Sequence, residues 1–326
     1  MKFAALIAAA SAHNLTEGVM SASEYEFMGF VSSYGRSYAT KAEYNFRLAQ
    51  YTKRVAEHKR WNAQPGQTSS QGVNHLTDRT DDEIAMLNGF KQMPTVAEDR
   101  TKVLEVDASA GPIDWRTKGA VTPVKNQGQC GSCWSFSTTG SMEGAHFVAT
   151  GELVSLSESN LVDCSWLNHG CNGGMYNLAY MYAESNPLET EAEYPYVAHT
   201  GLFDCKYKKA EGKVKVTTYN NVKGSSSEQL KAALNQHGPV SVAIEADKPV
   251  FHQYTGGVIT SDACGTSLDH AVLAVGWGTD ATAGDYYIVK NSWTTGWGEK
   301  GYVRIGIKEG KGVCGIQSQP AWPVTN

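Results

Sequence analysis

Apolar side chains between residues 24 and 62 recur at about helical spacing, with charged residues between them. This period is typical of an amphipathic helix that buries one face. Gly35 interrupts the pattern, so the sequence predicts two consecutive helices. A loop over 65–70 follows, and then a short helix over 81–87 whose first turn is acidic.

The pattern changes twice further along the chain. Residues 93–111 lose all periodicity and carry small and polar side chains, which predicts an exposed linker of the kind that proteases cut. Three helical patterns follow, at 133–150, 157–163 and 174–185, and Gly151 should end the first of them. Four β-rich runs separated by glycine come last, at 240–244, 271–275, 286–289 and 302–307. The chain after the linker therefore divides into a helical half, about 119–220, and a β half, about 221–326.

The N-terminus has the composition of a secretory signal peptide over residues 1–12. Lys2 supplies a positive start, an apolar segment follows, and Ala10-Ser11-Ala12 forms an A-x-A cleavage site. We therefore expect export, to a lysosome or acidic vacuole or to the outside of the cell. The net charge of −5 over 326 residues argues against a nucleic-acid partner. No later stretch approaches the roughly 20 apolar residues of a membrane span.

The chain has seven cysteines, all between residues 130 and 314. Disulfides are typical of exported proteins, and an odd count leaves at least one thiol unpaired. Cys130 and Cys133 form a C-x-x-C pair, which admits a zinc site, a redox dithiol, or a disulfide partner beside a free thiol. A zinc site fits poorly, because Cys164 and Cys171 are too far apart for a second close pair.

The segment around Cys133 carries the most specific motif. From Gln127 to Phe136 it reads Q-G-Q-C-G-S-C-W-S-F, and C-G-S-C-W is the local signature of a papain-type cysteine nucleophile. The expected partners follow downstream, His270 in L-D-H-A-V and Asn291 in V-K-N-S-W-T-T-G-W-G. The sequence thus resembles the papain family of cysteine proteases, and within it the cathepsin L-like enzymes.

This resemblance implies an α+β, papain-like two-domain fold. A helical left domain and a β-barrel-like right domain would enclose a cleft, with an α-helical propeptide in front of them. The resemblance also implies three disulfides that leave Cys133 free: Cys130–Cys171, Cys164–Cys205 and Cys264–Cys314. The implied domains are a signal peptide over 1–12, an inhibitory propeptide over 13–108 and a protease domain over 109–326, with the cut between Leu104 and Pro112.

The resemblance gives four residues catalytic roles. Cys133 would be the nucleophile, held as a thiolate by a helix N-terminus and by the imidazolium of His270. His270 would protonate the leaving amine and later activate water. Asn291 would aim the ring of His270, and Gln127 with the backbone N–H of Cys133 would form the oxyanion hole.

A second implied set binds substrate. Gly173 and Gly174 would let an extended peptide approach closely, and Trp293 would shield the His270–Asn291 bond. The pocket for the residue two before the cut (P2) would be mostly apolar and so would favour Leu, Phe or Val. Its floor, Gln319, is polar but uncharged, so aliphatic and aromatic residues would both be accepted and Arg would be accepted poorly. The remaining pocket and cleft residues are Met175, Tyr176, Ala243, Leu268, Asp269 and Ala271.

The N-terminal section resembles the inhibitory propeptide of the same enzymes. Glu43, Arg47, Tyr51 and Asn62 fit its long-helix motif, whereas Arg54 and His58 stand where that family has Asn and Ile. A second motif matches at Gly72, Asn74, Leu76 and Asp78, with Leu in place of Phe. Carboxylates paired in the zymogen should protonate in acid, so we expect faster activation below about pH 5.

The resemblance implies an endopeptidase that cuts proteins and peptides. The chain has no His-containing insertion between Cys171 and Cys205 and no Cys in the proregion, the features that restrict cathepsin B and cathepsin H. We expect a monomer without metal or other cofactor, whose own propeptide is its intramolecular inhibitor. Two other hypotheses remain: a catalytically dead homologue that binds proteases, and a disulfide oxidoreductase that uses Cys130 and Cys133.

Overall fold

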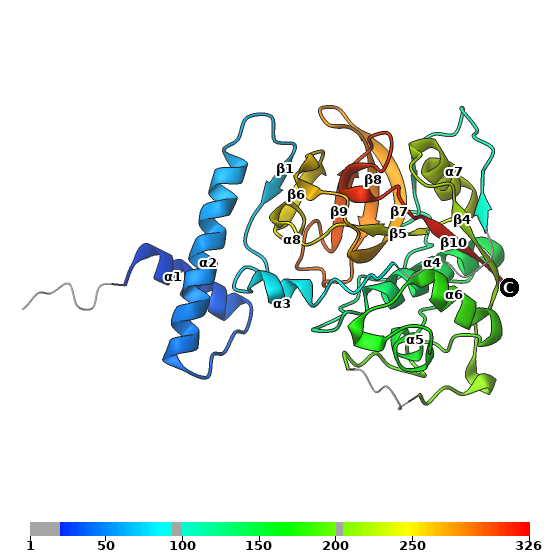
Figure 1. Cartoon of the computed structure of the whole chain (residues 1–326), viewed down its shortest axis with the longest axis horizontal. Helices are drawn as coiled ribbons and strands as arrows, with labels where there is room; N and C mark the ends of the chain where they lie inside the picture. The colour runs from blue at the N-terminus through cyan, green and yellow to red at the C-terminus, as the bar shows by residue number, and fades with distance from the viewer. Residues whose placement is uncertain (1–19, 93–99, 200–204) are drawn as a thin grey trace, which may run out of the picture.

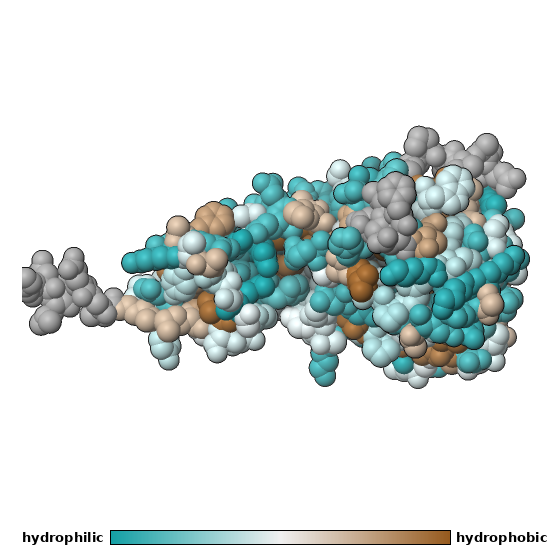
Figure 2. All heavy atoms as spheres, turned by 90° about the horizontal axis from the view of Figure 1, so that it is seen from below, coloured by the Kyte–Doolittle hydropathy of each residue, from teal (hydrophilic) through white to brown (hydrophobic). Residues whose placement is uncertain are grey.

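The computed structural model describes residues 20–92, 100–199 and 205–326. The signal-peptide prediction lies outside these residues, as does part of the predicted linker. Figure 1 shows the N-terminal helices standing beside a sheet-rich region, with a third, helical region below the sheet. On the face shown in Figure 2, exposed apolar side chains are scattered in small patches, as on most soluble proteins. Within the described residues, no helix is both long enough and apolar enough to cross a membrane.

The N-terminal region is a helical hairpin. Helices α1 (Ala22–Ser33) and α2 (Lys41–Asn62) begin at Ser21 and Thr40, whose side chains cap the first turns. Gly35 turns the chain between them with a φ of 58°, as the interruption in the pattern predicted. The hairpin buries an aromatic cluster around Phe27, Phe30 and Tyr51.

A strand and a short helix link this hairpin to the C-terminal region, which follows residue 110. Helix α3 (Asp81–Ala85) forms where the acidic turn predicted it, and Thr80 and Glu83 close it with a capping box. The loop expected over 65–70 is partly wrong, because β1 (Ser69–Gln71) pairs with β6 (Tyr254–Ile259). Two residues of the expected linker form β2 (Thr101–Lys102), which pairs with β4 (Val216–Val222). Short polar strands of this kind have no hydrophobic alternation to reveal them.

The C-terminal region has its first three helices where the pattern placed them. Helix α4 (Cys133–Thr150) ends at Gly151, whose φ is 79°, and Ser157 caps α5 (Glu158–Cys164). Helix α6 (Tyr176–Ser185) begins two residues later than expected. Helix α7 (Ser227–His237) and the single-turn α8 (Pro249–His252) lie in the β half and were not expected.

The strands form one sheet in the order β1-β6-β9-β8-β7-β5-β10-β4-β2, with β3 (Ile113–Asp114) paired to β7. The strands β5, β7, β8 and β9 correspond to the four predicted runs, and β10 closes the chain. Their bounds are Val240–Ile244, His270–Asp280, Gly284–Lys290, Tyr302–Gly306 and Ala321–Thr325. The N-terminal section thus supplies both outer strands of the path, β1 and β2.

Helix α4 lies between the helical and the β half of the C-terminal region. Ser137 and Ser141 donate hydrogen bonds from this helix to backbone carbonyls of Val272 and Pro239, each at 2.8 Å. The helix approaches so closely that a Cβ added to Gly140 would lie 2.7 Å from Leu273 Cδ2. This packing fixes the first turn of α4 against the start of β7.

The three disulfides form as the resemblance implied. They join Cys130 to Cys171, Cys164 to Cys205 and Cys264 to Cys314. Cys133 is the free cysteine. Because Cys130 is bonded to Cys171, the C-x-x-C pair is not a dithiol, which removes the basis of the oxidoreductase hypothesis.

Candidate active site

Cys133 is the first residue of α4, where the free N–H groups and the helix dipole favour a negative charge. Its side chain is fully buried, and the backbone N–H of Ala271 points to its Sγ at 3.4 Å. Burial raises the pKa of this thiol to about 12. With the propeptide in place, the surroundings therefore favour the neutral thiol.

His270 and Asn291 meet because β7 and β8 are neighbours. His270 begins β7, and Asn291 directly follows β8. His270 Nε2 lies 2.9 Å from Asn291 Oδ1, which also accepts the backbone N–H of Ser292 at 2.8 Å. The second bond identifies the amide oxygen, so His270 Nε2 carries the donated proton.

The other ring nitrogen of His270 is left for chemistry. Its Nδ1 is buried and has no hydrogen-bond partner among the described residues. The ring lies 4.8 Å from that of Trp293, which is 1% exposed and shields the bond to Asn291. Burial lowers the pKa of His270 to about 4, so the imidazole is neutral in this covered state. The thiolate–imidazolium pair remains a prediction for the open cleft.

The amide of Gln127 is held in one orientation. Its Oε1 accepts from Ser292 Oγ at 2.6 Å and from Trp293 Nε1 at 3.1 Å. The Nε2 group therefore faces the cleft, where it donates to the carbonyl of Leu87 at 2.8 Å and to that of Cys130 at 2.8 Å. The amide predicted to bind an oxyanion thus already binds a carbonyl oxygen of the N-terminal section.

Residues Leu87–Lys91 run through the cleft, and the sequence analysis did not single them out. Gly89 lies so close to the segment before α4 that an added Cβ would be 1.8 Å from Gly131 O. Its carbonyl accepts the N–H of Gly174 at 2.8 Å, and Gly174 accepts the N–H of Lys91 at 2.9 Å. The signal that could have found this segment is a glycine followed by Phe90, directly after the short helix.

Phe90 occupies the pocket predicted for substrate. Its ring stacks on Tyr176 at 5.4 Å, and its N–H donates to the carbonyl of Asp269 at 2.8 Å. One apolar cluster joins it to the predicted lining residues Met175, Tyr176, Ala243, Leu268 and Ala271. These five residues thus belong to the same apolar cluster as Phe90, whose ring contacts that of Tyr176.

Gln319 lies beside this cluster, on a cavity of about 430 Å³ that Met175, Asn177 and Ser318 also line. Its carbonyl accepts the hydroxyl of Tyr176. Its side-chain Oε1 is buried without a partner among the described residues. Gly173 lies under the side chain of Lys91.

Asp269 borders the cleft on the His270 side. Its carboxylate accepts from Asn88 Nδ2 at 3.0 Å and from the N–H of Ala246 at 2.7 Å. Burial raises the pKa of Asp269 to about 7. Of the predicted site residues, it alone offers the cleft a titratable carboxyl group.

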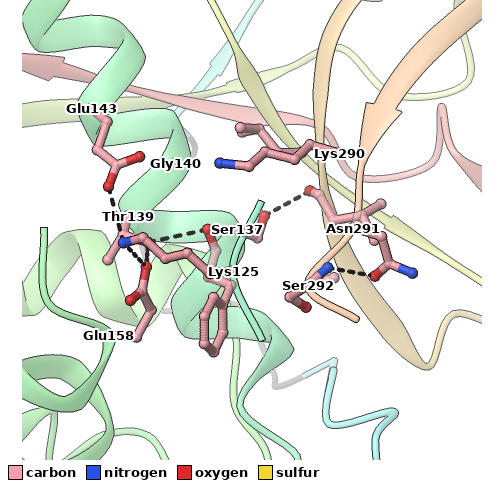
Figure 3. A pocket seen from close by; sticks show the side chains of 13 residues that line it. Lys125, Ser137, Thr139, Gly140, Glu143, Glu158, Lys290, Asn291 and Ser292 are labelled. Carbon is pink, nitrogen blue, oxygen red and sulfur yellow. Dashed lines mark hydrogen bonds and ion pairs between the residues drawn. The ribbon is translucent and has the colours of Figure 1, made fainter. Parts of the chain in front are cut away.

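A buried charged cluster lies behind the site and was also missed by the sequence analysis. Figure 3 shows Lys125 between Glu143 and Glu158, with Lys290 opposite, around a cavity of about 20 Å³. Lys125 Nζ lies 3.3 Å from Glu143 and 2.7 Å from Glu158. Lys290, next to Asn291, donates to Thr122 at 3.0 Å. The cluster ties the end of β8 to the helical half and so supports Asn291 from behind.

The comparisons with known proteins agree with this geometry. The family description "Papain family cysteine protease" matches residues 110–324, and "Cathepsin propeptide inhibitor domain (I29)" matches residues 27–84. The chain therefore belongs to the papain family of cysteine peptidases, of cathepsin L type, and carries the inhibitory propeptide of a zymogen.

Its relatives include both sequences and solved structures. It is 41% identical to digestive cysteine proteinase 1 of Homarus americanus, over 90% of this chain and 92% of that one. It is 37% identical to cathepsin L1 of Drosophila melanogaster, over 98% and 89%. The structure of digestive procathepsin L 3 from Tenebrio molitor larval midgut superposes with a TM-score of 0.83 at 35% identity, over 93% of this chain and 99% of that one.

Proposed function

We propose that this protein is an endopeptidase that cuts peptide bonds through Cys133 and His270, prefers an apolar P2 residue, and is activated in acid. The observation that carries the proposal is the arrangement of its polar groups. A free thiol begins α4, and the N–H of Ala271, which directly follows His270, points to it. Asn291 orients the His270 ring, whose Nδ1 has no hydrogen-bond partner among the described residues. A cysteine peptidase needs these groups in these roles.

The chemistry starts when the propeptide leaves. Water and a substrate carbonyl then replace Leu87 and Gly89, and a proton moves from Cys133 Sγ to His270 Nδ1. The thiolate attacks the peptide carbonyl carbon, and the imidazolium returns its proton to the leaving amine, so an acyl-enzyme remains. His270 next takes a proton from water as the water oxygen attacks the thioester carbon. The C–S bond then breaks, the carboxylic acid product leaves, and the Cys133 thiolate and His270 imidazolium are regenerated.

Gln127 is proposed to stabilise the oxyanion. Its Nε2 group already holds the carbonyl of Leu87, and Ser292 and Trp293 prevent the amide from turning. A preorganised donor is effective because it needs no reorientation during the reaction.

The P2 preference rests on the pocket around Phe90. Apolar side chains surround that ring, and the floor at Gln319 is neutral. Leu, Phe and Val at P2 would bury apolar area, whereas Arg would leave an unpaired charge in the pocket.

A peptide library tests activity and preference together. The acid-activated wild type should cleave peptides with Leu, Phe or Val at P2, and Cys133→Ala should cleave none. Gln319→Glu should raise the acceptance of Arg at P2 at least tenfold by pairing its charge. A wild-type profile dominated by Arg would contradict the preference, and cleavage by Cys133→Ala would contradict the nucleophile.

The maturation cut is proposed between Leu104 and Pro112, which would separate a propeptide over 13–108 from a protease domain over 109–326. Leu104 is fixed by two hydrogen bonds to the side chain of Gln229, at 2.7 and 2.9 Å, and Ile113 is fixed in β3. Residues 105–109, between these anchors, are all exposed. A bond there is open to attack while both ends stay attached.

We also propose an exported monomer that works in an acidic compartment or outside the cell. The cathepsin L-like relatives and the three disulfides support this address. The dead-homologue hypothesis has no support in the site, because Gln127, Cys133, His270 and Asn291 are all present and converge.

A further inference from the structure

A row of side chains joins the propeptide to the enzyme through one buried amide, that of Gln253. His58 Nε2, on α2, lies 3.0 Å from Gln253 Oε1. Gln253 Nε2 lies 2.9 Å from Nδ1 of His252, the last residue of α8. Thr77 donates to the same Gln253 oxygen at 3.1 Å. His58 is 4% exposed, and His252 and Gln253 are fully buried.

This row cannot hold two charged histidines. An amide offers one acceptor oxygen and one donor NH₂ group, whereas an imidazolium has an N–H on both nitrogens. If both rings were charged, both would need the single oxygen of Gln253. This holds whichever way the amide is turned. At least one histidine must therefore be neutral and present a lone pair to Gln253. Protonation of this remaining neutral ring breaks a buried hydrogen bond.

Burial and the charge of Arg54 oppose protonation of the row, whereas the weaker effects of Asp81 on His252 and of Glu57 on His58 favour it. Arg54 of α2, itself 2% exposed, acts on both rings, and its own charge is paired with Glu57 and with Asp81 of α3. Burial, and then Arg54, lower the pKa of His252 to about 3. Burial lowers the pKa of His58 as well, against the hydrogen bond to Gln253. When His252 Nδ1 accepts from Gln253, the neutral ring carries its proton on Nε2, which has no hydrogen-bond partner among the described residues. A charging proton must therefore go to Nδ1, where it faces the NH₂ group of Gln253.

The row lies beside hydrogen bonds that join the propeptide to the enzyme backbone. Asn74 Nδ2 donates to the carbonyl of His252 at 2.9 Å, and the N–H of Gly72 donates to that of Gln253 at 3.0 Å. The next residue, Tyr254, begins the pairing of β6 with β1. A displacement of His252 and Gln253 therefore loosens the adjoining strand pair.

We propose that His58, Gln253 and His252 form a proton-operated latch, which holds the propeptide when at least one ring is neutral and releases it when both are charged. The inference rests on the proposed acid activation and assigns its trigger. A released histidine has an ordinary pKa near 6.5, whereas the docked ones have lowered values. The open state thus binds more protons, so the grip is full above pH 6.5 and is lost as pH falls toward 3. His58 stands where the propeptide motif has Ile, so the trigger belongs to this chain.

Hydrogen exchange on the full-length Cys133→Ala chain tests the latch without any processing. After correction for intrinsic rates, protection of residues 69–71 and 254–257 should fall at least tenfold from pH 7 to pH 5. In the double variant H58Q/H252Q, whose amides do not titrate, the fall should stay below threefold. His146 is on α4 and bonds the C-terminal backbone, so H146Q is the matched control and should behave as the parent.

An equal fall in the parent and the double variant would overturn the latch. A second measurement covers a double variant that fails to fold. Ring NMR of the parent Cys133→Ala chain should give both histidines a pKa below 6, and two values near 6.5 would also overturn it. The Cys133→Ala chain cannot use the proposed nucleophile, so neither readout depends on whether the wild type cleaves peptides.

Discussion

At the scale of single residues, the site depends on side chains whose orientation is fixed by a second bond. Ser292 fixes the orientation of both Asn291 and Gln127. Its N–H donates to the side-chain oxygen of Asn291, and its hydroxyl donates to that of Gln127. The motifs predicted which residues converge, but the sequence could not show which atoms face the cleft. Orientation comes from contacts between β7, β8 and the segment before α4, which are distant in the sequence.

Asn291→Ala should lower kcat far more than it raises KM. Without the amide oxygen, the His270 ring loses its orientation and its Nε2–H loses a partner, so we expect a loss of about 10²-fold in kcat. Steady-state kinetics on one peptide substrate measures it. The melting temperature should be nearly unchanged. A large fall in melting temperature alongside the loss of kcat would mean that Asn291 has a structural role instead.

Gly89→Ala should weaken latency. A Cβ at this position meets Gly131 O at 1.8 Å, so the segment cannot lie in the cleft without moving. We expect spontaneous processing at pH 7 to accelerate at least tenfold, measured by gel densitometry. Gly29→Ala is the control, since its Cβ would meet nothing within 4 Å. Unchanged processing in Gly89→Ala would show that the cleft segment does not maintain latency.

At the scale of elements, the propeptide is held together by ion pairs between α2 and α3. Arg47 binds both carboxylate oxygens of Glu83, at 2.5 and 2.7 Å. The motif analysis found Arg47 but not its partner, because Glu83 belongs to a different element. The helices were predictable from their periodicity and caps, whereas β1 and β2 are two or three polar residues whose pairing depends on the enzyme's sheet edges.

Arg47→Ala should destabilise the propeptide by about 1–3 kcal/mol, since it removes the two shorter charge-assisted bonds of a half-buried carboxylate and leaves the longer one from Arg79, at 3.3 Å. The hydrogen bonds from Arg47 lower the pKa of Glu83 to about 2. The Arg47–Glu83 pair therefore contributes to propeptide stability fully above the ordinary Glu pKa near 4.5, and this contribution is lost as pH falls from there toward 2. Urea unfolding at pH 7 and pH 3 measures both effects, and a pH-independent difference between the two proteins would contradict them.

The acid activation expected from paired carboxylates stays a prediction, and Glu83 is one carboxylate that does not respond in its pH range. Glu83 keeps its charge at pH 4 to 5, so it cannot supply the response there. Buried neutral histidines titrate in the required range, and His75, whose pKa burial and Arg36 lower to about 4, is a further example. Asp269 works in the opposite direction, because burial raises its pKa and its protonated form is favoured in the covered cleft.

At the scale of the whole molecule, the chain places its own segment where a substrate belongs. The same sheet carries His270 in its middle and propeptide strands at its ends. The two-part enzyme region and the disulfides could be anticipated from composition and resemblance. The path of Leu87–Lys91 could not, because it follows from the shape of a cleft that two distant halves of the chain build.

The most direct test of the central claim is mass spectrometry of the purified zymogen, acidified in the presence of an epoxide that alkylates active thiolates. We expect a mature species of about 215–222 residues, which begins between residues 105 and 112, with one adduct on Cys133 and the six other cysteines in disulfides. An uncleaved or unlabelled chain would show that the site does not assemble into an active peptidase, and would contradict the account.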